Sequence, residues 1–209
     1  MTTPAGGLYI TADELKARLA ITGTSDDDQV QQAVQGASRA IDGYCERYFW
    51  QAADTRTYIP RDLYLTRTDD LVSVTTLATD PGGTAATGGT FPVTWPAGSF
   101  QLLPVNPGRT GEQRPYTAIR AVGGLTFPWV TPVLLARMDR VQVTGVFGWP
   151  AVPQAVSTAA QILAADLFKL KDAPFGVAGF GEFGVVRIDA NPQVSALLGP
   201  YVRHPVQAA

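Results

Sequence analysis

The chain has very few of the residues that build most metal and catalytic sites: one cysteine, Cys45, and one histidine, His204, among 209 residues. A single cysteine excludes an internal disulfide bond and a metal site made of cysteines alone. The histidine has no cysteine or second histidine with which to share a metal ion, so we interpret it as an exposed residue of a C-terminal tail. We therefore expect no metal and no cofactor.

Charged residues are also scarce. They make up 16% of the chain, whereas roughly 25% is usual for a globular protein. The 16 basic and 18 acidic residues give a net charge of −2 and form no basic run. This argues against a protein that grips DNA through its phosphates, and it suggests that partners cover some of the surface.

Long apolar runs are missing as well. No stretch approaches the roughly 20 apolar residues of a transmembrane helix, and residues 1–7 lack the basic-then-apolar pattern of a signal peptide. We expect a soluble protein made in a cytoplasm. Apolar residues nevertheless make up 45% of the chain, so a folded core is feasible.

The clearest pattern is a long amphipathic helix within residues 25–50. Ser25 can cap its start, and the three aspartates that follow lie where the helix dipole favours negative charge. Its apolar positions recur at the spacing of one buried helix face: Val30, Ala33, Val34, Ala37, Ile41, Tyr44, Cys45 and Tyr48.

Beside this apolar face runs a stripe of very small residues, Gly36, Ala40 and Gly43. Each glycine costs a helix about 1 kcal/mol relative to alanine, so two at helical spacing indicate that another backbone approaches closely. We predict that this stripe is a packing contact between subunits.

The remaining segments alternate between helical and extended patterns. Thr11 and Glu14 have the spacing of a capping box and open a short helix that ends near Ile21. From residue 54 to 149 the helical period gives way to short alternating runs, at residues 56–59, 71–77, 116–122 and 140–146, separated by Pro and Gly clusters. This is typical of a small antiparallel β unit. A very apolar helix begins at Pro153 and ends before Pro174.

The C-terminal part is rich in glycine and aromatic residues, and Asn191-Pro192 opens a last short helix. We predict that this part is an arm that orders against a partner. The apolar residues that we expect to dock are Phe175, Phe180, Phe183, Val194, Leu197, Leu198 and Tyr201.

We therefore predict an α+β fold: a helical body, made of a long helix pair and a later buried helix, with an inserted antiparallel β unit and a C-terminal arm. The expected boundaries are residues 1–53 for the first part of the body, 54–150 for the β unit, 151–172 for the returning helix and 173–209 for the glycine-rich loop and arm.

Other candidate sites have simpler interpretations. The G-x-G-x-x-G at residues 179–184 lacks the preceding strand and following helix of a dinucleotide site. Cys45 lies on an apolar helix face and is best interpreted as a small buried hydrophobe. Asp69 and Asp70 are typical turn residues. No paired carboxylates, catalytic triad or P-loop stand in a fitting context, so we expect a protein that is not an enzyme.

Three blocks, taken in order, resemble a known family. The first block is Tyr9-Ile10-Thr11 with Glu14-Leu15. The second is the end of the long helix, residues 37–45, with Arg47-Tyr48-Phe49 after it. The third runs from Val143 to Pro150 with Val152-Pro153 and leads into a long helix that contains Phe168 and is followed by Asp172-Ala173-Pro174. In these blocks the chain resembles the head-to-tail connector, or adaptor, proteins of tailed double-stranded DNA phages and related gene-transfer particles.

The resemblance implies a structural role without catalysis. It implies a homo-oligomeric ring, generally of twelve copies, that binds under the portal at the capsid vertex of the virion. It also implies that the ring extends the DNA channel, without sequence-specific binding to DNA, and docks a stopper or tail protein. Assembly would take place in the host cytoplasm.

Two alternatives remain open. One is another neck or tail component, such as a stopper or a tail-end ring protein. The other is a β module that binds a ligand or carbohydrate on a platform of Trp95, Trp129 and Trp149, although these aromatics more simply fill a small β core.

Overall fold

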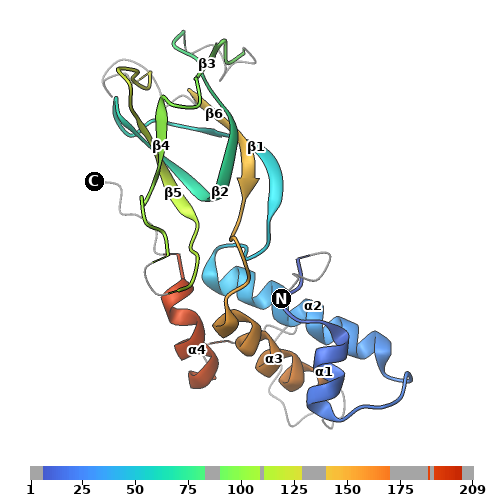
Figure 1. Cartoon of the computed structure of the whole chain (residues 1–209). Helices are drawn as coiled ribbons and strands as arrows, with labels where there is room; N and C mark the ends of the chain where they lie inside the picture. The colour runs from blue at the N-terminus through green and yellow to red at the C-terminus, as the bar shows by residue number, and fades with distance from the viewer. Residues whose placement is uncertain are drawn as a thin grey trace, which may run out of the picture. The chain divides into compact units, whose positions relative to one another are not determined.

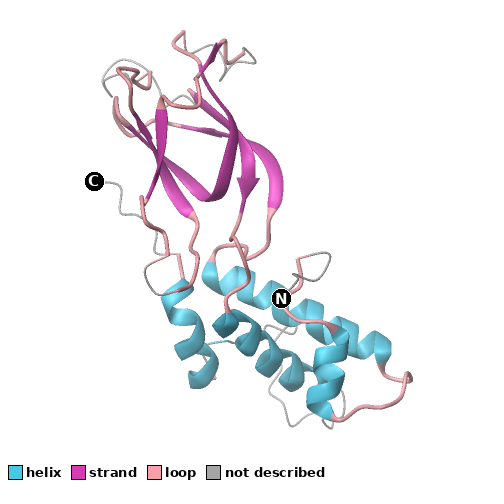
Figure 2. Cartoon of the chain, viewed as in Figure 1, coloured by secondary structure: helices cyan, strands magenta, loops and turns pink. Residues whose placement is uncertain are grey.

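The computed structural model describes residues 7–82, 90–108, 111–128, 140–169, 188 and 191–203. The chain divides into two compact units, one drawn from residues 1–50 and 151–209 and the other from residues 51–150. The first is built from helices and the second from strands (Figures 1 and 2). The predicted α+β fold, with helical parts and an inserted antiparallel sheet, is confirmed.

The helical unit contains α1 (Ala12–Leu19), α2 (Asp27–Cys45), α3 (Gln154–Lys169) and α4 (Pro192–Leu198), followed by the 3₁₀ turn η4 (Gly199–Tyr201). The capping box of α1 is present as predicted. The Glu14 backbone N–H donates to Thr11 Oγ1 at 3.1 Å, and the Thr11 N–H donates to Glu14 Oε2 at 2.7 Å. Two of the free N–H groups at the helix start are thereby satisfied.

Helix α2 buries the face that the periodicity predicts, but its ends differ. Its N-cap is Asp26, without a side-chain cap bond, rather than Ser25. It ends at Cys45 because Glu46 adopts a left-handed conformation, with φ of 52°. Tyr48 therefore lies beyond the helix and is 53% exposed instead of joining the buried face.

Helix α3 is the centre of this unit and packs against α1, α2 and α4. Helix α4 begins as predicted, because the Asn191 side chain accepts from the backbone N–H groups of Gln193 and Val194. The ring of Tyr201 meets that of Phe49 edge to face, with 5.8 Å between ring centroids. The C-terminal helix is thus part of the core of the helical unit.

The β unit is one antiparallel sheet, whose described strands follow the order β1-β6-β2-β5-β4, with β3 paired to β2. The strands are β1 (Ala52–Tyr58), β2 (Leu65–Thr79), β3 (Val93–Thr94), β4 (Phe100–Leu103), β5 (Tyr116–Ala121) and β6 (Val141–Phe147). Strand β2 pairs with β5 through its first part and with β6 from Leu71 onward, with register shifts on both sides. One long strand therefore joins two partners.

Asp69 and Asp70 lie inside β2 and not in a turn, so that prediction is wrong. Asp70 is buried and accepts from Trp149 Nε1 at 3.0 Å, while its carbonyl accepts from the Gly148 N–H at 2.8 Å. These bonds satisfy the buried carboxyl within the strand, so the local turn preference is overridden.

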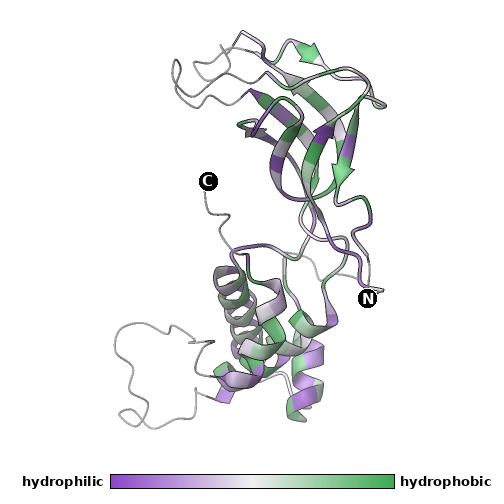
Figure 3. Cartoon of the chain, turned by 90° about the vertical axis from the view of Figure 1, so that its left-hand side faces the viewer, coloured by the Kyte–Doolittle hydropathy of each residue, from purple (hydrophilic) through white to green (hydrophobic). Residues whose placement is uncertain are grey.

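The core of the β unit is formed by alternate residues of the strands, along which hydrophobic and hydrophilic residues alternate (Figure 3). Trp95 stacks on Phe127, with 4.8 Å between ring centroids. Gly145 interrupts the pattern for a steric reason: a Cβ there would lie 2.1 Å from the Ser73 carbonyl oxygen of β2. Only glycine allows the two strands this close.

Candidate functional site

The predicted stripe on α2 has two different ends. A Cβ added at Gly36 would lie 3.2 Å from Leu167 Cδ1, so this end faces α3 of the same chain. At Gly43 an added Cβ would meet nothing within 4 Å. Ala40, between them, is half-buried. The Gly43 end therefore leaves room for another molecule.

Gly43 lines a hollow of about 540 Å³ at the C-terminal end of α2, which we call the Gly43 hollow. Both signs of charge occur in its wall, together with the exposed ring of Tyr48; the lining residues are Arg39, Asp42, Gly43, Glu46, Arg47 and Tyr48. Tyrosine and arginine are enriched at protein interfaces, because the tyrosine ring supplies contact area and arginine supplies hydrogen bonds.

A buried polar network supports this hollow. The Tyr9 hydroxyl donates to Asp42 Oδ1 and accepts from the Phe49 N–H at 3.1 Å, while Arg39 Nη2 lies 3.0 Å from Asp42 Oδ2. Burial raises the pKa of Asp42 to about 6, against the lowering effects of the Tyr9 hydrogen bond and the Arg39 charge. Burial also raises the pKa of Tyr9. The network ties Tyr9, in the segment before α1, to Asp42 of α2 and to Phe49 in the segment that follows α2.

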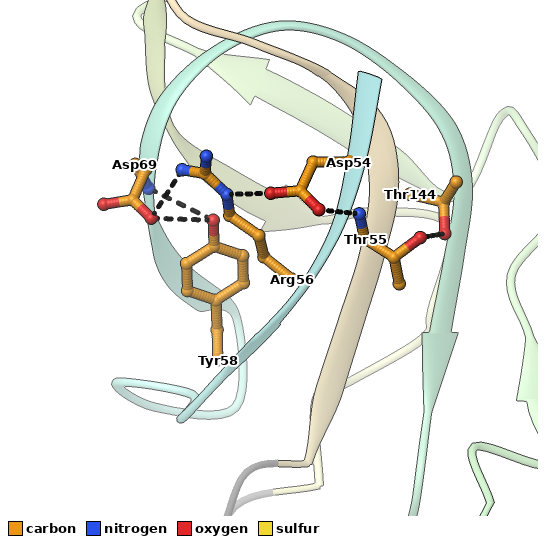
Figure 4. Close-up of polar contacts among 6 residues, drawn as sticks. All are labelled: Asp54, Thr55, Arg56, Tyr58, Asp69 and Thr144. Carbon is orange, nitrogen blue, oxygen red and sulfur yellow. Dashed lines mark hydrogen bonds and ion pairs between the residues drawn. The ribbon is translucent and has the colours of Figure 1, made fainter. Parts of the chain in front are cut away.

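A second polar group lies on β1 and the neighbouring part of β2 (Figure 4). Arg56 Nε donates to Asp54 Oδ2 at 2.8 Å, and its Nη1 donates to Asp69 Oδ2 at 3.1 Å. The Tyr58 hydroxyl also donates to Asp69 Oδ2, at 3.3 Å. The guanidinium of Arg56 therefore bridges two carboxylates from different strands (Figure 4).

These bonds are reflected in the pKa values of the group. The Arg56 hydrogen bond and the Thr55 N–H hold the pKa of Asp54 below its usual range. Burial and the nearby Asp69 carboxylate raise the pKa of Tyr58. Apolar periodicity does not predict this group. The Asp-x-Arg spacing within β1 is a usable signal for it, because that spacing places both side chains on one face of the strand.

The predicted docking residues separate into two sets. Phe175, Phe180 and Phe183 lie outside the described residues. Val194, Leu198 and Tyr201 are buried within the helical unit, and Leu197 is half-buried. The first three are therefore the only ones of the seven whose surroundings the structure does not describe.

The other candidates are placed as follows. His204, Trp129 and the glycine motif at residues 179–184 lie outside the described residues. Cys45 is fully buried, and burial raises the pKa of its thiol to about 12. Trp95 and Trp149 are buried in the β unit, so neither offers a ring face as a binding platform.

The described residues give two findings on other classes of site. They contain no group of three or more His, Cys, Asp or Glu side chains that could hold a metal ion. None of the helices in this part of the chain is both long and apolar enough to cross a membrane.

Residues 9–73 match the family model described as phage gp6-like head-tail connector protein. A comparison with curated proteins found no matching relative. The family match confirms the resemblance to head-to-tail connectors and supports a connector role in a phage virion.

Proposed function

From the match of residues 9–73 to the phage head-tail connectors, we propose that this chain is a structural head-to-tail adaptor of a tailed phage. In this proposal, copies of the chain form a ring under the portal, a dodecamer as the family resemblance implies. The ring extends the DNA channel and docks a stopper or tail protein.

The family match is the observation that carries the proposal. It spans α1, α2, β1 and the first part of β2, and so includes residues of both compact units. A net charge of −2 without a basic run also suits a channel, because phosphate-binding Lys and Arg would retard the passage of DNA.

Electron microscopy of phage particles that carry a labelled copy of this chain tests the role directly. We expect the label at the capsid vertex, between portal and tail. Label found only along the tail tube or at its distal end would favour a tail component instead, and absence of label from the particle would refute the adaptor role.

Within the ring, we propose that the Gly43 hollow receives a side chain or helix of the neighbouring copy. Gly43→Leu should leave the melting temperature nearly unchanged, because nothing lies within 4 Å of the new Cβ, but it should block ring assembly on portal-bearing heads. Gly98→Leu is the matched control, since an added Cβ at Gly98 also meets nothing within 4 Å and Gly98 lies outside both the hollow and the proposed arm. Rings formed equally well by both variants would refute the contact.

The second proposed contact is a docking arm after residue 173. Removing the whole arm would also remove the buried side chains of Val194, Leu198 and Tyr201 from the core of the helical unit. A truncated chain could then fail to join heads to tails because it is unstable and not because it lacks a docking contact. Replacing Phe175, Phe180 and Phe183 together by serine keeps α4 in place. We expect fewer heads joined to tails at an unchanged melting temperature, and normal joining would contradict the arm.

A further inference from the structure

Strand β1 ends the sheet, and among the described strands it pairs with β6 alone (Figure 1). An edge strand exposes backbone N–H and C=O groups that can pair with a strand of another molecule. A protein that must avoid such pairing needs a way to occupy these groups.

The backbone of Thr55 points toward the open side of this edge. The Tyr58 carbonyl accepts from the Arg140 N–H at 3.1 Å, on the β6 side. Since backbone groups alternate along a strand, those of residues 54, 56 and 58 face β6 and those of Thr55 face away. The hydroxyl oxygens of Thr55 and Thr144 lie 2.8 Å apart, as expected for a non-hydrogen-bonded pair, whose side chains are close.

The outward N–H of Thr55 is already occupied. It donates to Asp54 Oδ1 at 2.8 Å, while the other oxygen of this carboxylate accepts from Arg56 Nε at 2.8 Å. Arg56 is fixed in turn by Asp69 of β2 and by the ring of Phe147, whose centroid lies 4.3 Å from the guanidinium carbon. We call Asp54, Arg56 and Asp69 the edge clamp.

We propose that the edge clamp keeps β1 from pairing with β1 of a second copy of this chain. The clamp places a carboxylate on the N–H that an incoming strand would need, and two like strands would bring two such carboxylates together (Figure 4). This inference concerns the free chain and does not depend on the connector role.

Asp54→Ala tests the clamp in the full-length protein. Analytical ultracentrifugation over a concentration series should show a larger species for this variant at concentrations where the wild type remains smaller. Asp54→Asn, which keeps an oxygen acceptor for the Thr55 N–H, should associate less than Asp54→Ala. Equal masses for wild type and Asp54→Ala at every concentration would overturn the proposal.

A pair of double variants separates edge pairing from association through unfolding. Proline at position 55 removes the outward N–H and is tolerated on an edge strand. Asp54→Ala/Thr55→Pro should therefore lose the association, whereas Asp54→Ala/Thr55→Ala, which keeps the N–H, should retain it. Association that persists with proline overturns the proposal.

Amide exchange at Thr55 supplies a measurement that needs no association. We expect the Thr55 N–H to exchange severalfold faster in Asp54→Ala than in the wild type, because its acceptor is gone. An unprotected Thr55 N–H in the wild type would contradict the clamp.

Discussion

Asp42→Asn should remove a defined part of the pH dependence of stability. Asp42 lines the Gly43 hollow with its carboxyl largely buried, and burial raises its pKa from 3.8 to about 6. The folded state therefore binds this proton more tightly than the unfolded state does. The resulting stabilisation is fully present below about pH 4 and is lost as the pH rises through the folded-state pKa.

The size of the effect follows from the shift. A tenfold difference in proton affinity corresponds to about 1.4 kcal/mol, so raising the pKa from 3.8 to about 6 contributes about 3 kcal/mol of unfolding free energy between low and neutral pH. Asparagine keeps an oxygen acceptor for the Tyr9 hydroxyl but does not titrate. The difference in stability between wild type and Asp42→Asn should therefore change by about this amount between about pH 4 and 7.

Urea unfolding at a series of pH values measures this difference, because the contributions of the other titrating groups to the free energy of unfolding cancel between the two proteins. Tyr9→Phe gives a second check: the Tyr9 hydrogen bond lowers the pKa of Asp42, so its removal should move the transition to higher pH. A stability difference between wild type and Asp42→Asn that is constant across this range would refute the reasoning.

Two further predictions concern packing. Phe49→Ala should cost the helical unit about 3–5 kcal/mol, because this fully buried ring contacts both Tyr9 and Tyr201; calorimetry measures the loss, and a shift of less than about 1 kcal/mol would contradict it. Gly145→Ala should cost about 3 kcal/mol or more, since its Cβ would collide with the Ser73 carbonyl, whereas Gly98→Ala, in open space, is the control and should melt like the wild type.

The helices were predictable because their signals are local. The capping box of Thr11 and Glu14 and the periodicity of α2 depend on residues within one or two turns. The end of α2 was not predictable in the same way. Glu46 takes the left-handed conformation usually adopted by glycine, so no residue type in the sequence marks the end of the helix. The periodicity therefore places Tyr48 on the buried face, although the helix ends before it.

Strands are harder to predict from the sequence where both of their faces carry polar residues. The alternation of residues 71–77 predicts a strand, but the first part of β2 reads Leu-Thr-Arg-Thr-Asp-Asp and has no alternating pattern. Its buried Asp70 is satisfied by Trp149, 79 residues away. A single sequence cannot reveal that pairing, because the partner that makes burial favourable lies on another strand.

The sequence also does not show which surface covers an apolar helix face. The spacing of Val194, Leu198 and Tyr201 shows that these side chains need burial, but it fits a surface of the same chain as well as a partner. The structure supplies the cover from within the helical unit. Contacts between copies should therefore be sought among large side chains that the folded chain leaves exposed. Tyr48 is such a side chain, since it is 53% exposed and lines the Gly43 hollow.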